Sequence, residues 1–342
     1  MATPSAIRCD MTVPDDILAM LGAAVRRRFG SAAEIANIEQ PTLGGSNRTI
    51  VFDLVEGNAR RRLVSRQNTI SGALNPFLSA AEQFRVMALV HRQGFPVPEP
   101  VFAFDAQDQL GEGFVCAFIE GETMPKRILA APAFAAVRPR LAAQCGELLA
   151  RLHAIDPSEA AFLESVPDSS DPIATQAVRL DSYQEPHPAI ELGLRWLTRS
   201  RPPAGPPVLL HGDFRTGNLM VDAAGLCGVL DWECSHLGTP AEDLGWLCTR
   251  SWRFGQPQHA VGGFGELSDL LAGYTRAGGR RIDADEIRYW SIFGLVRWAV
   301  LNVMQGYGHD TGERASPVFA ACGRNTTLVE YELLMTLAGH YQ

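Results

Sequence analysis

The chain has 342 residues, of which 46% are hydrophobic and 20% charged, so it is a globular protein with one large domain or two modest ones. Its formal net charge of −8 argues against non-specific nucleic-acid binding. Its seven cysteines form no CxxC pair, which argues against a zinc ribbon or a disulfide framework and favours reduced thiols in a cytosol. No signal-peptide core and no run of about 18 apolar residues is present, so we expect a cytoplasmic location and no membrane span.

The first 120 residues predict a small sheet with helices. Residues 14–29 form an amphipathic pattern with acidic residues near the positive end of the expected helix. The runs TIVFDLV (49–55) and RRLVSRQ (61–67) flank the turn signal Glu56-Gly57-Asn58, which predicts an antiparallel hairpin. Residues 79–93 predict a helix, the proline-rich residues 95–105 an extended segment, and residues 113–121 a strand that ends at Gly121.

After Gly121 the pattern becomes mainly helical. We expect a helix over 134–153 with Pro139 near a boundary or kink, a polar loop over 157–172, and helix over 173–200 with a break at Pro186 and Pro188. The runs NLMVD (218–222) and CGVLDW (227–232) predict a second hairpin. Residues 240–342 are expected to be mostly helix, including the strongly apolar stretch 289–304.

Three polar side chains lie in or after the run LLHGDFRTGN (209–218), which begins with two leucines that we expect to be buried. A tight second hairpin brings Asn218, at the start of one strand, near Asp231, at the end of the next, and Asp213 lies just upstream. An amide oxygen and a carboxylate, together with water and phosphate oxygens, suit octahedral Mg²⁺, and a further carboxylate can orient and deprotonate a hydroxyl. Each residue taken alone is explained as well by the capping of a turn; the three together favour the chemistry.

The motifs HGDFRTGN and LDWE resemble the aminoglycoside phosphotransferase-like (choline kinase-like) branch of the protein-kinase fold, and in particular the phosphotransferase domain associated with some acyl-CoA dehydrogenases. The resemblance spans about residues 43–246. It implies an α+β, two-lobe fold, with a β-rich nucleotide-binding lobe over 1–120 and a helical lobe over 121–342 that carries the catalytic loop and substrate site. It further implies that Asp213 is the catalytic aspartate, that Asn218 and Asp231 bind Mg²⁺, that His211 is a structural support, and that Asp243 braces the loop.

The same resemblance implies where ATP binds. A flexible turn over the phosphates corresponds to Gly44, Gly45, Ser46 and Asn47, although an ordinary turn explains these residues as well. The family's strand lysine has no counterpart, since Lys126, the only lysine, lies beyond Gly121. Period-2 alternation puts Arg62, Val64 and Arg66 on one face of the strand and Leu63 and Ser65 on the other. The resemblance then implies that Val64 packs under the adenine and that Arg66 reaches the α- and β-phosphates, where a permanently charged guanidinium can bind phosphate; a solvated arginine is the alternative. Glu82 is the candidate ion-pair partner of Arg66, or a plain surface glutamate, and the backbone of Phe118, Ile119 and Glu120 is expected at the adenine edge.

These residues predict an ATP- and Mg²⁺-dependent phosphotransferase that acts on a hydroxyl of a small molecule. The acceptor stays open between an aminoglycoside and a neutral or anionic hydroxy compound such as a hydroxyacyl thioester; the mixed charges after residue 283 disfavour a polycation. ATP versus GTP and the oligomeric state stay open too. The rivals are a catalytically idle pseudokinase, favoured by the missing lysine, and a metal-dependent hydrolase that uses His211 and Asp213.

Overall fold

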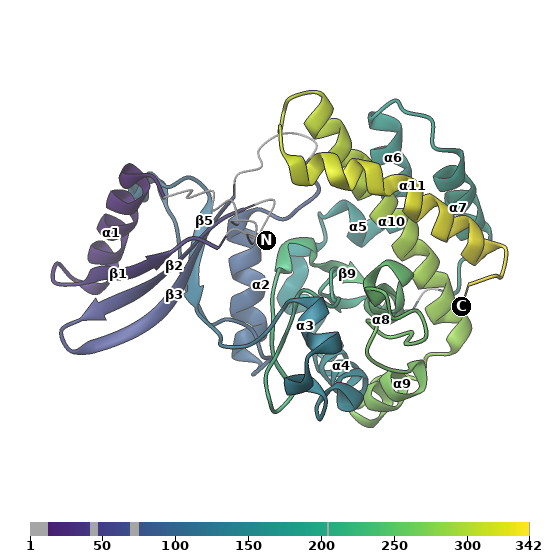
Figure 1. The fold of residues 1–342 in the computed structure, drawn as a ribbon, viewed down its shortest axis with the longest axis horizontal. Coiled ribbons are helices and arrows are strands. Elements are labelled where there is room, and N and C mark those ends of the chain that lie inside the picture. Colours follow the sequence, from purple (N-terminus) through teal and green to yellow (C-terminus); the bar gives the residue numbers. More distant parts are fainter. Residues whose placement is uncertain (1–12, 42–46, 69–74, 204, 342) are drawn as a thin grey trace, which may run out of the picture. The chain divides into compact units, whose positions relative to one another are not determined.

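A computed structural model describes residues 13–41, 47–68, 75–203 and 205–341 of the chain (Figure 1). The turn predicted at Gly44, Gly45 and Ser46 lies outside the described residues. The chain forms two compact units that alternate along the sequence. The first contains Met1–Asn75, Ser79–Phe84 and Glu99–Phe118, and the second contains Pro76–Leu78, Arg85–Pro98 and Ile119–Gln342.

The first unit is built on a five-stranded antiparallel sheet with the strand order β1-β2-β3-β5-β4. The predicted hairpin is confirmed, and β2 and β3 pair over their full length around the Gly57 turn. Strands β1 and β4 were not predicted as strands, and β5 ends at Ala117 rather than Gly121. The elements of this unit are α1 (Asp15–Phe29), β1 (Glu34–Glu39), β2 (Asn47–Glu56), β3 (Ala59–Asn68), β4 (Pro100–Ala103), η1 (Ala106–Asp108) and β5 (Gly113–Ala117).

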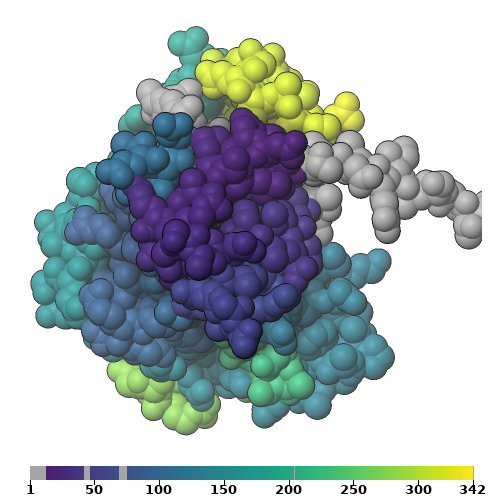
Figure 2. Space-filling model, turned by 90° about the vertical axis from the view of Figure 1, so that its left-hand side faces the viewer, coloured from purple at the N-terminus to yellow at the C-terminus, as the bar shows by residue number. Residues whose placement is uncertain are grey.

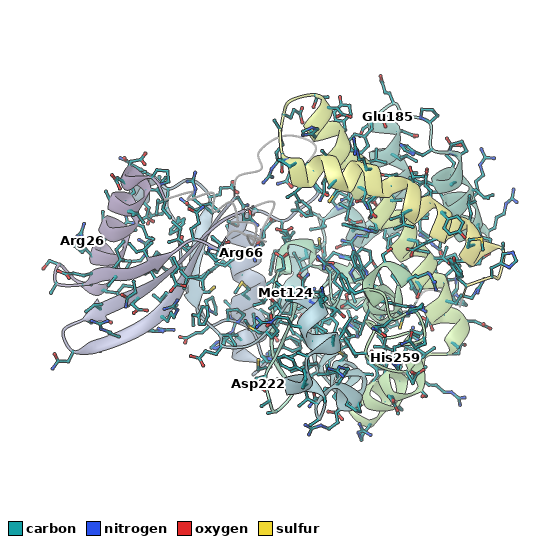
Figure 3. All side chains as sticks on the ribbon, viewed as in Figure 1. Arg26, Arg66, Met124, Glu185, Asp222 and His259 are labelled. Atoms are coloured by element: carbon teal, nitrogen blue, oxygen red, sulfur yellow. The ribbon has the colours of Figure 1, made fainter. Side chains whose placement is uncertain are left out.

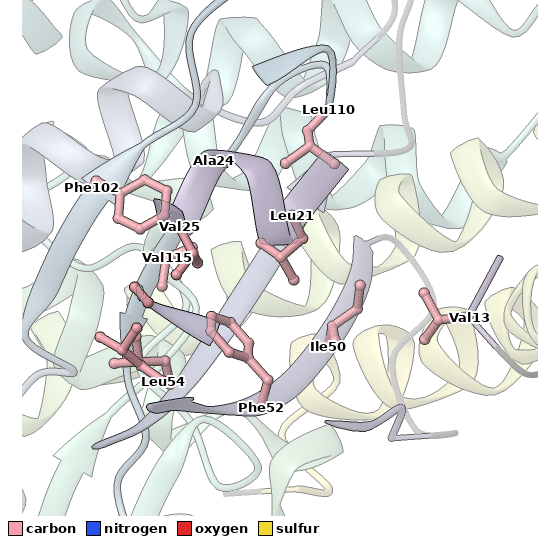
Figure 4. Close-up of a cluster of buried hydrophobic side chains, with 12 residues drawn as sticks. Val13, Leu21, Ala24, Val25, Ile50, Phe52, Leu54, Phe102, Leu110 and Val115 are labelled. Atoms are coloured by element: carbon pink, nitrogen blue, oxygen red, sulfur yellow. The ribbon is translucent and has the colours of Figure 1, made fainter. Parts of the chain in front are cut away.

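One face of this sheet packs against α1. Leu21 and Val25 of α1 join Ile50 and Phe52 of β2 in a cluster from which water is excluded (Figure 4). Burying each such side chain contributes about 1.5–3 kcal/mol, so this contact holds the sheet in shape. Figure 2 shows the first unit from the left-hand side of Figure 1, where the purple residues of α1 lie beside the first strands.

Helix α2 (Ala80–Arg92) begins in the first unit and continues into the second, which is mainly helical. The second unit also contains two short antiparallel pairs, β6 with β9 and the predicted hairpin of β7 with β8. Its remaining elements are α3 (Pro125–Ala130), η2 (Pro132–Phe134), α4 (Arg138–His153), η3 (Pro157–Leu163), α5 (Pro167–Ser170), α6 (Pro172–Ser182), α7 (Pro188–Arg199), β6 (Val208–Leu210), β7 (Leu219–Val221), β8 (Leu226–Val229), η4 (Trp232–Cys234), β9 (His236–Gly238), α8 (Pro240–Cys248), η5 (Arg250–Arg253), α9 (Leu267–Arg276), α10 (Ala284–Asp310) and α11 (Pro317–Leu337).

The predicted helices are present, although the one expected over 134–153 begins at Arg138, and one predicted loop is wrong. Pro139 lies in the first turn of α4, where a missing N–H costs nothing, and the break between α6 and α7 falls at the expected prolines. The segment 157–172 is not a loop, because it contains η3 and α5. Asp156 caps η3 by accepting the Ser158 N–H, and Pro157 follows it, which is a local helix-start signal. In the described part of the chain, no helix has the length and apolarity that crossing a lipid bilayer requires.

Candidate active site

The loop of residues 211–218 connects β6 to β7 and is fastened to α8 by Asp243. Oδ2 of Asp243 accepts the His211 N–H, and Oδ1 accepts the Gly212 N–H, both at 2.8 Å. Gly212 has φ +76°, and a Cβ there would collide with the carbonyl oxygen of Cys234, so the turn requires glycine. Burial alone would raise the pKa of Asp243, but the hydrogen bonds from His153 and the His211 amide lower it below its usual range. The predicted brace is therefore an ionised, buried carboxylate.

The imidazole of His211 is buried and both of its nitrogens are used. Nδ1 accepts the Asp213 N–H at 3.1 Å, so Nε2 must carry the proton that it donates to the Leu230 carbonyl at 3.0 Å. Burial lowers the pKa of His211, which favours this neutral form. The contacts fit a structural support that ties the loop to the end of β8, and they leave no ring nitrogen to act as a base.

The carboxylate of Asp213 is oriented by three side-chain donors. Oδ2 accepts the amide of Asn218 at 2.6 Å, and Oδ1 accepts the indole N–H of Trp246 at 2.8 Å and Nε of Arg215 at 3.0 Å. The side chain of Asp213 is 15% exposed, so one part of it stays reachable from solvent. A largely buried carboxylate with a fixed orientation is what a group that positions a reacting hydroxyl needs.

The β7–β8 hairpin places Asn218 beside the end of β8. Leu219 pairs with Val229, and the Leu230 N–H donates to the Asn218 carbonyl at 2.8 Å. The side-chain nitrogen of Asn218 is directed to Asp213, so its amide oxygen is the atom turned to other partners. Asp231 follows with φ +69°, a left-handed conformation that aspartate tolerates better than most residues.

The Asp213 and Asp231 carboxylates lie near the same histidine. Both charges act on His211 and oppose the effect of burial on its pKa. Asn218 bonds Asp213 directly, a contact that the sequence analysis did not specify. The roles of Asn218 and Asp231 at a metal stay predictions.

The oxygen donors of this site are of the type that hard divalent cations prefer. Among the described residues, no group of three or more His, Cys, Asp or Glu side chains could hold a metal ion, and such a group is what a resident zinc site needs. Asn218 and Asp231 offer one amide and one carboxylate oxygen. Mg²⁺ binds through one or two such ligands and completes its octahedron with water and substrate phosphates, so these residues fit Mg²⁺ bound together with a nucleotide.

Of the predicted nucleotide-binding residues that the structure describes, Asn47 lies on β2, and Val64 and Arg66 lie on β3. Arg66 is opposite Phe114 and Val64 is opposite Cys116 in the β3–β5 pairing, so these four share one face of the sheet (Figure 3 labels Arg66). The alternate residues Leu63, Ser65 and Gln67 are buried on the other face, which confirms the predicted alternation. Burial raises the pKa of Cys116 to about 12, and the Arg66 charge opposes this shift. Asn47 begins β2 opposite Asn68.

The other predicted nucleotide-binding residues have local contacts. Oε2 of Glu82 accepts the N–H and the hydroxyl of Ser79, a capping box at the start of α2. Phe118 is 37% exposed, and its N–H donates to the Arg62 carbonyl. The Glu120 carbonyl faces the thiol of Cys227 at 3.5 Å, and Ile119 packs near Gly228. Their roles at a nucleotide stay predictions.

Sequence reasoning missed three residues around the loop. His153 bonds Asp243 through Nε2 at 3.3 Å and the Tyr274 hydroxyl through Nδ1 at 3.0 Å. Trp246 donates to Asp213, and Arg297 donates to the Gly212 carbonyl at 2.6 Å. Arg297 interrupts the apolar run of α10, which was the one sequence signal that could have marked it.

Comparisons with known proteins identify the class. The chain resembles a putative aminoglycoside phosphotransferase from Ralstonia eutropha with a TM-score of 0.68 and 22% identity, covering 95% of this chain and 98% of that one. It also resembles APH(2")-IIa in a ternary complex with streptomycin and ATP, with a TM-score of 0.56 and 15% identity over 83% of this chain and 91% of that one. The predicted fold is thus confirmed as the two-lobe α+β fold of kinase-like phosphotransferases.

The amino-acid sequence shows which family the chain belongs to. Residues 37–281 match the phosphotransferase enzyme family, and the chain belongs to it. Acyl-CoA dehydrogenase family member 10 of Mus musculus is 29% identical over 255 residues, which are 71% of this chain. The match takes up only 23% of the mouse protein, so this chain corresponds to about a quarter of that relative's length.

Proposed function

We propose that this chain transfers the γ-phosphoryl group of ATP to a hydroxyl of a small molecule. The observation that carries the proposal is the Asp213 carboxylate, fixed by Asn218 at 2.6 Å on a loop of a phosphotransferase-family chain. Family membership supports a phosphotransferase, and the ATP-bound relative supports ATP as the donor.

In the proposed reaction Asp213 accepts a hydrogen bond from the acceptor hydroxyl and takes its proton. The acceptor oxygen forms a bond to the γ-phosphorus while the bond from that phosphorus to the β,γ-bridging oxygen breaks, and ADP leaves with that electron pair. Such transition states are loose, so orientation and charge supply most of the rate enhancement.

Asn218 and Asp231 are proposed to hold Mg²⁺. When bound, Mg²⁺ offsets negative charge on the β- and γ-phosphate oxygens. Arg66 is proposed to bind the α- and β-phosphates, with Val64 under the adenine, Phe118, Ile119 and Glu120 at its edge, and Glu82 as support for Arg66. Gly44, Gly45 and Ser46, together with Asn47 at the start of β2, are proposed to cover the phosphates.

For the acceptor, we propose a neutral or anionic hydroxy compound rather than a polycation. The Arg215 guanidinium lies 3.0 Å from the proposed base and 4.6 Å from the ring centroid of Trp252. An ammonium-rich acceptor would bring like charge to this position, which costs electrostatic free energy. Hydroxyacyl thioesters are the first candidates, since a relative of this chain is an acyl-CoA dehydrogenase family member.

A phosphorylation screen tests this function. The protein, Mg²⁺ and ATP labelled in the γ-phosphate are incubated with a library of hydroxy compounds that includes aminoglycosides and hydroxyacyl-CoAs. We expect label transfer to at least one acceptor, with wild-type protein and not with Asp213→Ala. A pseudokinase would bind ATP and transfer no label, and its basal ATP hydrolysis would not change on Asp231→Ala.

A further inference from the structure

The indole of Trp246 is the most buried of the three donors to Asp213. Trp246 lies on α8, three residues after Asp243, and is 3% exposed. Its N–H can only donate, and it meets Oδ1 of Asp213 at 2.8 Å. Because the ring turns about only two side-chain torsions and both are packed, the direction of this hydrogen bond is fixed.

Arg297 contacts two groups that position the Asp213 carboxylate. Its guanidinium donates to the carbonyl of Gly212, the residue before Asp213, at 2.6 Å. The guanidinium carbon also lies 5.0 Å from the ring centroid of Trp246, within the range of a cation–π contact. One buried cation therefore contacts both the backbone that carries Asp213 and the ring that orients its side chain.

Packing alone does not account for the Trp246 contact. Two other buried tryptophans, Trp252 and Trp290, have an indole N–H without a partner among the described residues. The fold therefore accommodates indole rings whose N–H makes no hydrogen bond, and the bond from Trp246 to Asp213 is a separate feature of the site.

We propose that Trp246 and Arg297 are positioning residues for phosphoryl transfer, with the Trp246 N–H setting the rotation of the Asp213 carboxylate that presents it to the acceptor hydroxyl. This inference rests on the proposed function. Asn218 holds Oδ2, and Trp246 holds Oδ1. The side chain of Arg215, the third donor, is 24% exposed, so a substrate can replace its hydrogen bond to Asp213. The side chains of Asn218 and Trp246 are buried, so a substrate cannot replace theirs.

The test compares Trp246→Phe with the matched change Trp290→Phe. Both remove one buried indole N–H and keep an aromatic ring, but only Trp246 donates to Asp213. We expect Trp246→Phe to lower kcat about ten- to a hundredfold, with the KM for ATP within about twofold of wild type. Trp290→Phe is expected to change kcat less than about twofold. A normal kcat in Trp246→Phe, or equal losses in both variants, would overturn the role of Trp246.

A double-mutant cycle in urea supplies a readout that needs no activity. The midpoints of unfolding are measured for wild type, Trp246→Phe, Asp213→Ala and the double variant. We expect the loss in the double variant to be smaller than the sum of the single losses, because one hydrogen bond is removed only once. Additive losses would overturn the inference. A wild-type chain without ATP turnover would instead contradict the proposed function, and with it the catalytic part of this inference, whereas a non-additive cycle would still establish the contact.

Arg297 is tested by two replacements. Arg297→Lys keeps a charge that can donate to the Gly212 carbonyl, and Arg297→Met keeps only the bulk. We expect the kcat of Arg297→Lys to exceed that of Arg297→Met at least about fivefold, with equal KM for ATP. Should Arg297→Met fail to fold, Arg297→Lys is compared with wild type, and a loss above about a hundredfold would contradict the role of the Gly212 contact, because lysine retains it.

Discussion

The carboxylate of Asp243 accepts the backbone N–H of His211 at 2.8 Å across 32 residues of sequence. The same carboxylate accepts the Gly212 N–H and lies 3.3 Å from Nε2 of His153. All of these groups are buried, so water cannot replace the side chain if it is lost. The conformation of the loop that carries Asp213 therefore depends on one ionised side chain of α8.

Asp243→Asn is expected to lower the free energy of unfolding by about 2–4 kcal/mol. An amide has one acceptor oxygen where the carboxylate has two, so its NH₂ group would face a backbone N–H. Urea unfolding measures the loss. The matched change Asp285→Asn on the exposed start of α10 is expected to stay within about 0.5 kcal/mol of wild type. Equal effects of the two changes would contradict the brace.

Asp213→Asn is expected to lower kcat by about a thousandfold, because the amide cannot take the acceptor proton. The change alters no predicted nucleotide contact, so the dissociation constant of ATP, measured by calorimetry, should stay within about threefold of wild type. Asp269→Asn, at an exposed position of α9, serves as the control. Turnover at a normal rate in Asp213→Asn would show that another group accepts the proton.

Asp231→Asn is expected to raise the Mg²⁺ concentration for half-maximal activity at least about tenfold, because a neutral amide replaces the one charged side chain that is proposed as a ligand. Asp222→Asn is the control from the same hairpin. Its carboxylate accepts the Ala224 and Gly225 N–H groups, which an asparagine oxygen can also accept. An unchanged Mg²⁺ titration in Asp231→Asn would refute the assignment.

The elements predicted from the sequence are those with local signals. The β2–β3 and β7–β8 hairpins each join adjacent strands through a turn, and the long helices carry an apolar stripe. The missed strands have weak or distant signals. β1 is a charged, largely exposed edge strand, so it lacks a clear hydrophobic pattern. β6 is only three residues long, and its partner strand β9 is distant in the sequence.

The contacts of the candidate site also divide into those with a local sequence signal and those without one. Asp213 and Asn218 are five residues apart on one loop, so their contact could be expected from the motif. Trp246 and Arg297 reach that loop through the packing of α8 and α10, which no local pattern specifies. The capping box of Ser79 and Glu82 was readable, because a serine three residues before a glutamate marks a helix start.

Arg215→Met is expected to relax the choice of acceptor. Methionine keeps an apolar contact with Trp252 but removes the charge beside Asp213. The ratio of kcat/KM for a cationic acceptor to that for a neutral one should rise about tenfold, which corresponds to about 1.4 kcal/mol. This is less than the interaction energy of two unit charges about 4 Å apart near a protein surface. Arg195→Met, on the exposed surface of α7, is the control. An unchanged ratio would show that Arg215 does not discriminate by charge.

Protonation of His236 makes the free energy of unfolding depend on pH. Burial alone would lower its pKa, but the Glu242 carboxylate, 3.0 Å from Nε2, raises it above 6.5, with Asp168 adding to the increase and Arg297 opposing it. The folded protein then holds the proton more tightly than the unfolded chain. The stabilisation is fully present below about pH 6.5 and is lost as the pH rises through the raised pKa of the folded state.

His236→Gln should therefore cost more free energy of unfolding at pH 5.5 than at pH 9, as urea titrations at both values will measure. For His211→Gln we expect the loss of free energy of unfolding to depend on pH in the opposite direction. Burial lowers the pKa of His211, so the folded state disfavours the proton, and the contribution of His211 falls as the pH drops below about 6.5. The cost of His211→Gln should be greater at pH 9 than at pH 5.5. The same pH dependence in both variants would contradict the assignment of a charged His236 beside Glu242 and a neutral His211 behind the loop.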